Sequence, residues 1–462
     1  MSSKKLWQGA CFAATATMAT LGTAYAQTPA PADQTPAPAA TTTAPAAAPA
    51  APAAPPPGFW IDGIHLSAQL DAGVIFNPFR PSTGLNWGQA FTDHGNQAQL
   101  NQLLLTAEKP LDPKDPDYQW GFKVQFMYGS DARFTQYLGQ FNNALPGDRY
   151  QFDLVEANVQ AHVPFPTAGG MDIKVGQYAT PLGYETINPI TNPFYSHSYI
   201  FQYGLPYEHT GALTVTHLTG MVDLYAGVDT GTNTTWGPLG DNNGAVGGIG
   251  GFNLTLYDGN LTILALSHLG PEQSTRVLST NAAAAGLPTF NANGTWRAFN
   301  DAVVTYKYSD ALTLTTEFNW ARDSYGFDNK PVNAFGAAQY ASYTLTDTLT
   351  LNGRLEVWRD DSNFFVAAFS GNNDPVRVEQ GLTPISNVYA APGGNTTYGA
   401  LTLGVTYKPT LPVITSLLIR PEIRWDHAFT TNNPFNQNYV TGPGNKGGAN
   451  SFTFGADAVV TF

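Results

Sequence analysis

Long stretches in which apolar and polar residues alternate strictly constrain the fold of this chain more than any other feature. In "IHLSAQLDAGVIF" (64–76) every second residue is apolar, and the residues between them begin with His65, Ser67, Gln69 and Asp71. Successive side chains of a β-strand point to opposite faces, so this pattern predicts strands with one apolar and one polar face. The same alternation runs through 118–129, 154–163 and 452–462.

The length of these stretches separates two classes of β-protein. The stretch 64–76 is thirteen residues long, whereas the strands of soluble sandwiches average about five or six residues. A tilted membrane-spanning strand needs about 9–11 residues. Aromatic residues also gather at the ends of the stretches, as in the girdles of membrane barrels: Trp60, Tyr118, Trp120, Tyr308, Trp320, Trp425, Phe429 and Phe462. We therefore expect an all-β, transmembrane, antiparallel up-and-down barrel.

Composition excludes several classes of function. The net charge is −13, which argues against a nucleic-acid partner, because phosphate binding needs a basic surface. The only cysteine is Cys11, within the leader described next, so the remaining chain has no disulfide, cysteine metal site or catalytic cysteine.

The N-terminal region predicts export and then a spacer. Residues 1–26 contain Lys4 and Lys5, an apolar stretch and the small-residue pattern Ala24-Tyr25-Ala26, which is typical of a secretory signal peptide. The alternative is an uncleaved membrane anchor. Residues 27–57 are almost entirely Ala, Pro and Thr, a composition typical of a disordered linker. The barrel would occupy 58–462.

The connections between the predicted strands alternate between short and long. The short ones lie near Gly220, Gly259, Asp310 and Asp347 and at 109–117, 164–170 and 409–415. The long ones lie at 78–97, 131–149, 180–209, 231–246, 270–297, 323–335, 360–396 and 430–450. Outer-membrane barrels show this asymmetry, with short periplasmic turns and long external loops. Seven short and eight long connections join sixteen strands; fourteen or eighteen are alternatives, since the strands at 97–109, 246–270 and 335–346 are the least regular.

One long segment resembles a known family. "GQYATPLGYETINPITNPFYSHSYIFQYGLPYEHTG" (176–211) and "MYGSDARF" (127–134) are similar to the β-barrel porin family of the OmpL-like type. The C-terminal pattern with Phe454, Val460 and Phe462 resembles the signal that the barrel-assembly machinery reads in outer-membrane porins. The resemblance implies a porin in the outer membrane of a Gram-negative bacterium, in contact with the lipid bilayer and with small hydrophilic solutes. A homotrimer is expected on the same analogy.

The third long connection, 180–209, is the candidate constriction. In sixteen-stranded porins this loop folds into the lumen, and by analogy we expect the same here. Prolines stiffen the segment and prevent it from forming a strand, and it contains no Lys or Arg. An external lid over the barrel mouth is the alternative. The candidate residues are Tyr184, Glu185, Tyr195, His197, Tyr199 and Glu208.

Charged residues on the polar faces of the strands predict the lumen wall. A charge that faces lipid at mid-membrane costs about 2–4 kcal/mol, so these residues should face inward. Two interpretations remain open: a transverse field across the pore that selects solutes, or salt bridges that only stabilise the wall. The candidates are Lys123, Lys174, Lys307, Glu317, Arg354, Glu356, Arg420, Glu422 and Arg424.

Catalysis is not indicated. His162, Ser196 and His197 are available, but no Gly-x-Ser-x-Gly or His-Glu-x-x-His motif accompanies them. We therefore expect no enzyme, no cofactor and no metal site. The function that the sequence predicts is passive diffusion of small hydrophilic solutes and ions. The alternative is a structural or adhesive outer-membrane barrel whose lumen is blocked.

Overall fold

The computed structural model describes most of the chain beyond residue 58. The chain divides into two units, Met1–Pro55 and Pro56–Phe462. The described residues are 59–112, 115–141, 144–145, 148–237, 240–241, 243–273, 292–324, 330–369, 388–390, 395–411, 416–436 and 447–462. The predicted signal peptide and the predicted linker lie outside them and remain predictions.

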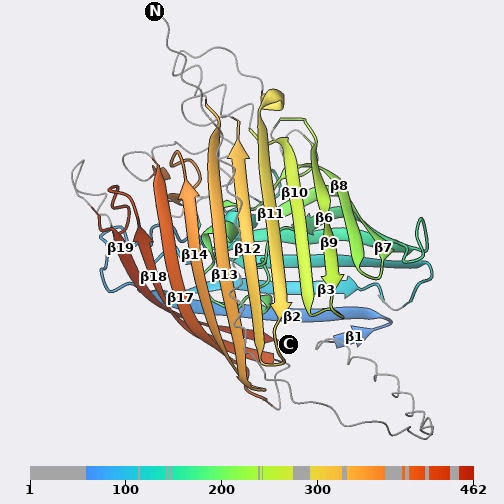
Figure 1. Ribbon diagram of the computed structural model, residues 1–462, viewed down its shortest axis with the longest axis horizontal. Helices are drawn as coiled ribbons and strands as arrows, with labels where there is room; N and C mark the ends of the chain where they lie inside the picture. Colours follow the sequence, from blue (N-terminus) through green and yellow to red (C-terminus); the bar gives the residue numbers. More distant parts are fainter. Residues whose placement is uncertain are drawn as a thin grey trace, which may run out of the picture. The chain divides into compact units, whose positions relative to one another are not determined.

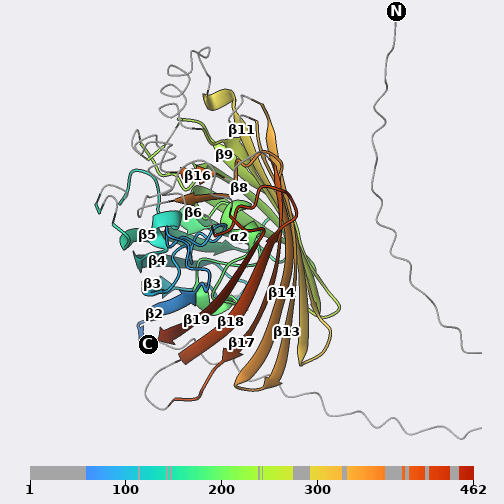
Figure 2. The same ribbon diagram turned by 90° about the vertical axis from the view of Figure 1, so that its left-hand side faces the viewer.

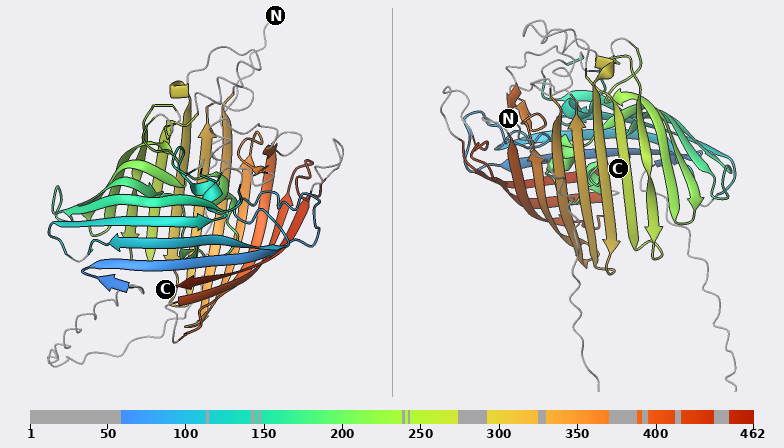
Figure 3. Two further views of the ribbon diagram at one scale, coloured as in Figure 1. Left: turned by 180° about the vertical axis from the view of Figure 1, so that it is seen from behind. Right: turned by 45° about the horizontal axis from the view of Figure 1, so that its top comes forward.

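Sixteen long strands in the described residues form a closed antiparallel barrel, which confirms the predicted fold class. Each strand pairs with its neighbour along the chain, and β19 pairs with β2 to close the ring. Figure 1 shows β9 to β14 and β17 to β19 as one side of this ring, and Figure 3 shows β2 to β7 from behind. The strands are β2 (Ile64–Phe76), β3 (Gln97–Lys109), β4 (Gln119–Gly129), β5 (Gln151–Val163), β6 (Met171–Ala179), β7 (Glu208–Thr219), β8 (Val222–Thr232), β9 (Gly247–Leu256), β10 (Leu261–Pro271), β11 (Trp296–Lys307), β12 (Leu312–Asp323), β13 (Val332–Thr346), β14 (Leu349–Asp360), β17 (Thr396–Tyr407), β18 (Ser416–Ala428) and β19 (Asn450–Thr461).

Shorter elements lie in the connections between these strands. β14 pairs directly with β17, because β15 and β16 form a separate two-stranded sheet. None of the helices in the described part of the chain is long and apolar enough to cross a bilayer. The short elements are β1 (Phe59–Ile61), α1 (Ala132–Thr135), η1 (Pro189–Thr191), α2 (Tyr199–Tyr203), η2 (Ala292–Gly294), β15 (Ala367–Phe369) and β16 (Val388–Ala390).

The two-residue alternation separates the two faces of each strand as the sequence predicts. In β18, Arg420, Glu422 and Arg424 are buried on the inner face, while Ile419 and Ile423 are exposed on the outer face. The aromatic residues at the strand ends are largely exposed, including Tyr118, Trp120, Tyr308, Trp425 and Phe429. An outer surface of this kind suits lipid, because apolar side chains face outward while polar side chains stay inside.

The core of the barrel lies in its lumen and is built from both strands and loops. Buried aromatic and aliphatic side chains form two clusters that combine strand residues with residues of the long connections. The short helix α2, from the third long connection, lies inside the ring of strands, against β13 and β14 (Figure 2). The barrel is therefore packed internally, rather than empty, at the level of these loops.

Candidate functional site

The segment between β6 and β7, residues 180–207, is the candidate functional site and is called the lumen loop below. Its local structure follows from its sequence. Pro189 opens η1, and the Asn188 side chain accepts a hydrogen bond from the Ile190 N–H. The Ser198 hydroxyl caps α2 by accepting from the Phe201 N–H at 3.1 Å. Proline and the two side-chain caps thus favour two short helical elements, η1 and α2, over a continuous strand in this segment.

Glu185 joins the lumen loop to the opposite wall. Its carboxylate lies 2.8 Å from Arg354 of β14 and 2.7 Å from Nδ1 of His197. It also accepts hydrogen bonds from the Ser198 N–H, at 3.1 and 3.2 Å, and from the Tyr340 hydroxyl at 3.0 Å. Burial acts to raise the pKa of Glu185, but Arg354 and His197 outweigh it and lower that pKa to about 2. Glu185 is therefore charged at every physiological pH.

Three wall arginines donate to backbone carbonyls of the lumen loop. Arg354 donates to the Ser196 carbonyl at 2.8 Å. Arg424 donates to the His197 carbonyl at 2.6 Å. Arg420 donates to the carbonyls of Pro189, at 2.6 Å, and Asn192, at 2.7 Å. All three side chains are fully buried, so they bind the loop rather than face open water.

Wall carboxylates accept from the backbone N–H groups of the same loop. Glu422 accepts from Tyr195 at 2.9 Å. Glu356 accepts from Tyr199 at 2.7 Å, and Glu317 accepts from Tyr184 at 3.0 Å. A buried irregular backbone must find partners for its polar groups, and the charged faces of β12, β14 and β18 supply them. The predicted wall residues and the predicted loop residues therefore meet in one network.

Glycines in the wall make room for the aromatic side chains of the lumen loop. A Cβ added at Gly73 of β2 would lie 2.5 Å from the Tyr195 ring, which is closer than any real Cβ contact. A Cβ at Gly404 of β17 would lie 3.1 Å from the Phe194 ring. The aromatic side chains of the loop are thus fitted to one part of the wall, which runs from β17 through β18 and β19 to β2.

The first two long connections also fold into the lumen, which the sequence did not predict. Asp93 of the first connection binds Arg133 at 2.9 Å and Arg149 at 2.7 Å, both from the second. Burial acts to raise the pKa of Asp93, but these arginines and His94 lower it. The sequence signal that could have indicated this inward folding was Arg133, a charged residue within "MYGSDARF" in a chain with only 12% charged residues.

Four of the predicted residues lie apart from this network. Lys123 binds Glu156 of β5 at 3.4 Å and its side chain is 26% exposed. Lys174 is partly exposed on β6. Lys307 lies at the end of β11 and pairs with Asp310 of the following turn at 3.1 Å. Glu208, which the sequence placed in the loop, is instead the first residue of β7, where it is buried beside Asp153 and away from the arginines.

The space that remains beside the lumen loop is small. A cavity of about 10 Å³ lies between the loop and β2 and β3, with Asp71, Asn101, Tyr195 and Arg420 in its lining. This volume holds about one water molecule. The lumen loop therefore fills much of the lumen at this level.

Comparisons with known proteins agree with this architecture. A family model described as "Putative beta-barrel porin-2, OmpL-like" matches residues 63–462. No curated protein matches the chain.

Solved structures share the fold at low sequence identity. The anion-selective porin from Comamonas acidovorans has a TM-score of 0.50 at 10% identity, covering 86% of this chain and 99% of its own. OprB of Pseudomonas putida has a TM-score of 0.50 at 12% identity, covering 87% and 94%. Salmonella typhi OmpF, in a complex with daunomycin, has a TM-score of 0.50 at 11% identity, covering 87% and 99%. At these identities the likeness concerns the fold alone.

Proposed function

Because the chain belongs to the OmpL-like β-barrel porin family, whose model matches residues 63–462, we propose that it is a passive diffusion channel for small hydrophilic solutes and ions. The family membership confirms the resemblance seen in the sequence and supports an outer-membrane location. In this proposal the lumen loop is the constriction, and its fixed position limits the size of the solutes that pass.

The observation that carries the proposal is the binding of the lumen loop to the inner wall by charged side chains. Arg354, Arg420 and Arg424 hold loop carbonyls, and Glu356 and Glu422 hold loop N–H groups. Buried charges are costly unless they are paired and hydrogen-bonded. Here that cost is offset by contacts that fix a loop across the lumen, as a constriction requires.

This geometry favours one of the two interpretations of the charged wall. Arg354, Arg420 and Arg424 are fully buried and paired, so in our proposal they act through the loop and not as a field felt directly by solutes. Lys123 and Lys174 are more accessible and are the proposed solute-facing cations. The resulting preference would come from these two lysines.

A blocked structural barrel is the second candidate, and one observation favours it. The described parts of the first three long connections pack inside the lumen, and the cavity beside the lumen loop, of about 10 Å³, has room for only about one water molecule. The two functions differ in their electrical behaviour. A porin in a planar bilayer gives stable conductance steps, whereas a blocked barrel stays silent although it is folded.

Planar-bilayer recording of the full-length, processed protein tests the proposal. We expect stable steps in the intact protein and larger steps after deletion of about 186–206. Asp310→Asn, in a turn at the other end of the strands, is the control and should leave the conductance unchanged. A folded but silent barrel would overturn the diffusion function, and unchanged conductance after the deletion would place the constriction elsewhere.

Assembly belongs to the same proposal. Phe454 lies on β19 and Phe462 directly follows it; both are exposed, and the barrel-assembly machinery could read them together with Val460. Substituting Phe462 by Ala should reduce the amount of folded barrel in the outer membrane without changing its conductance. The proposed homotrimer is tested by the mass of the purified, detergent-solubilised complex.

A further inference from the structure

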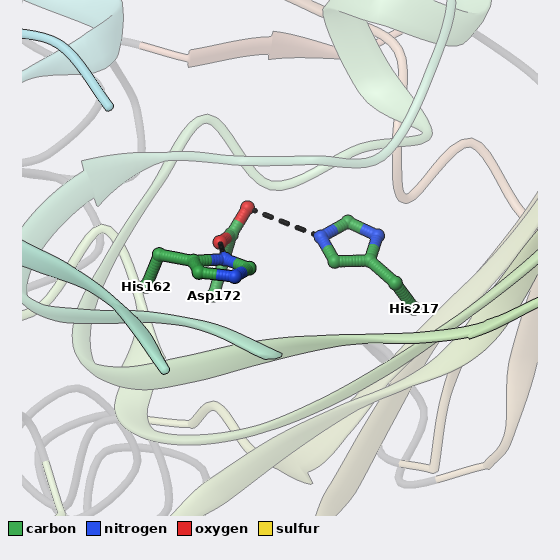
Figure 4. A group of neighbouring side chains, drawn as sticks. All are labelled: His162, Asp172 and His217. Carbon is green, nitrogen blue, oxygen red and sulfur yellow. Dashed lines mark hydrogen bonds and ion pairs between the residues drawn. The ribbon is translucent and has the colours of Figure 1, made fainter. Parts of the chain in front are cut away.

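We propose that His162, Asp172 and His217 form a binding site for a divalent transition-metal ion, with Zn²⁺ as the expected ligand. The three side chains come from the adjacent strands β5, β6 and β7 and point toward one another (Figure 4). One ligand atom from each lies within 4.8 Å of the others. The site is separate from the lumen loop and does not depend on the proposed channel function.

Strand register brings these side chains together. His162 lies directly opposite Asp172 in the β5–β6 pair. The Asp172 carboxylate lies between the two imidazoles: one oxygen is 2.7 Å from Nδ1 of His162 and the other is 3.3 Å from Nε2 of His217. Ligand atoms around a tetrahedral zinc ion, at about 2.0–2.2 Å from the metal, lie roughly 3.3–3.5 Å apart. The two distances to Asp172 are near this range and all three ligand atoms lie within 4.8 Å of one another, so side-chain rotations could bring them around an ion.

A second carboxylate orients His217. Asp223 of β8 is the register partner of His217, and its carboxylate lies 2.7 Å from Nδ1. When Nδ1–H donates to this carboxylate, Nε2 carries the lone pair and faces Asp172. Metal-binding histidines characteristically have such a carboxylate behind them, which fixes the tautomer and raises the basicity of the ring. Asp223 is thus a positioning residue and not one of the proposed ligands.

The turn between β5 and β6 borders the site with two glycines. A Cβ at Gly170 would lie 2.6 Å from Nε2 of His162, and a Cβ at Gly169 would lie 2.7 Å from the His217 Cβ. The turn can approach both histidines so closely only because these two residues have no side chain. Asp172 and His217 remain 40% and 31% exposed, so an ion can reach them from solvent.

The donor set points to a late transition metal. Imidazole suits Zn²⁺, Cu²⁺ and Ni²⁺, whereas Mg²⁺ and Ca²⁺ prefer sites built only from oxygen. A second group, His209, Asp229 and His268, has the same composition but is completely buried. There the Asp229 carboxylate lies 3.1 Å from Nδ1 of His209 and 3.0 Å from Nε2 of His268, with no access from solvent. The accessible group is therefore the better candidate for reversible metal binding.

Metal titration of the tag-free, processed barrel in detergent tests the proposal. Zn²⁺ binding is measured by calorimetry, and Co²⁺ absorption spectra report the coordination of the ion. We expect one accessible site per chain in the wild type, and its loss in the double variant H162Q/H217Q. D223N should weaken Zn²⁺ binding about 10–100-fold while keeping one site.

The controls separate this site from other histidines. H65Q removes another histidine that pairs with a carboxylate across neighbouring strands, Glu108 at 3.1 Å, and should leave binding unchanged. Retention of heat-modifiable migration on gels shows that each variant is folded. Absence of Zn²⁺ and Co²⁺ binding in the wild type would overturn the proposal. So would undiminished binding in H162Q/H217Q, which would place the ion elsewhere, including at the buried group.

Discussion

Replacing Glu185 by Gln should release the lumen loop from the wall. The carboxylate accepts from Arg354, His197, Ser198 and Tyr340, and the pKa of Glu185 falls from 4.5 to about 2. At about 1.4 kcal/mol for each pH unit, this difference corresponds to about 3 kcal/mol of interaction with the charged form. The amide keeps the size of the side chain but loses most of that interaction. The opening equilibrium of the loop should therefore rise on the order of 100-fold.

Cysteine labelling measures that equilibrium. The only native cysteine is Cys11, in the predicted leader, so S196C in the processed chain provides a single probe. Ser196 is 1% exposed, and a maleimide should reach the probe only when the loop opens. We expect labelling of E185Q/S196C to be on the order of 100-fold faster than that of S196C alone.

The matched control is Glu156, a buried glutamate of β5 that does not bind the lumen loop. Glu156 is 6% exposed and binds Lys123 and Asn158, both wall residues. E156Q/S196C should therefore label at the rate of S196C. Equal rates for E185Q/S196C and S196C would refute the conclusion that Glu185 anchors the loop.

Three further substitutions test other parts of the lumen. Burial raises the pKa of Asp131 from 3.8 to about 7, so between these pH values the folded protein retains a proton that the unfolded chain loses. The free energy of unfolding should therefore fall as pH rises from about 4 to about 7. D131N should remove this fall and be more stable than the wild type at pH 8, as measured by thermal unfolding at pH 4–8. G73L should lower the unfolding temperature because its Cβ would meet the Tyr195 ring at 2.5 Å, whereas G220A, with open space around it, should not. R420M should lower the free energy of unfolding by about 3–5 kcal/mol in urea titrations, because it leaves Asp457 buried without its partner, whereas K307M at an exposed turn should have no measurable effect.

The barrel could be predicted well from the sequence because the alternation of apolar and polar residues is itself what makes the chain form membrane-spanning strands. In lipid, the outer face of each strand must be apolar, so every second residue of a membrane-spanning strand is apolar. One of the three least regular regions, 97–109, is also a strand with the predicted bounds, β3. Strand pairing in chain order then followed from the short turns, as at β7–β8 and β13–β14.

The contents of the lumen were predicted less completely. The sequence indicated that Glu185 and the wall arginines belong to one region, but not that Arg354 would bind Glu185 while Lys174 would not. Those partners are set by how the loops fold in three dimensions, and no period in the sequence encodes them. The pairing of Asp93 with Arg133 inside the lumen was not predicted for the same reason, because the sequences of the first two connections are typical of external loops. The proximity of His162, Asp172 and His217 could not be predicted either, because it depends on the register of three neighbouring strands.

The network around the lumen loop also has a consequence for the order of assembly. The loop belongs to the first half of the chain, but its anchors belong to the second: Tyr195 and Glu422 are 227 residues apart, and Pro189 and Arg420 are 231 apart. Contacts of such long range form only after the intervening chain has been placed. The loop can therefore reach its contacts with Arg420 and Glu422 only after β18 has been placed, which is one strand before β19 pairs with β2 and closes the ring.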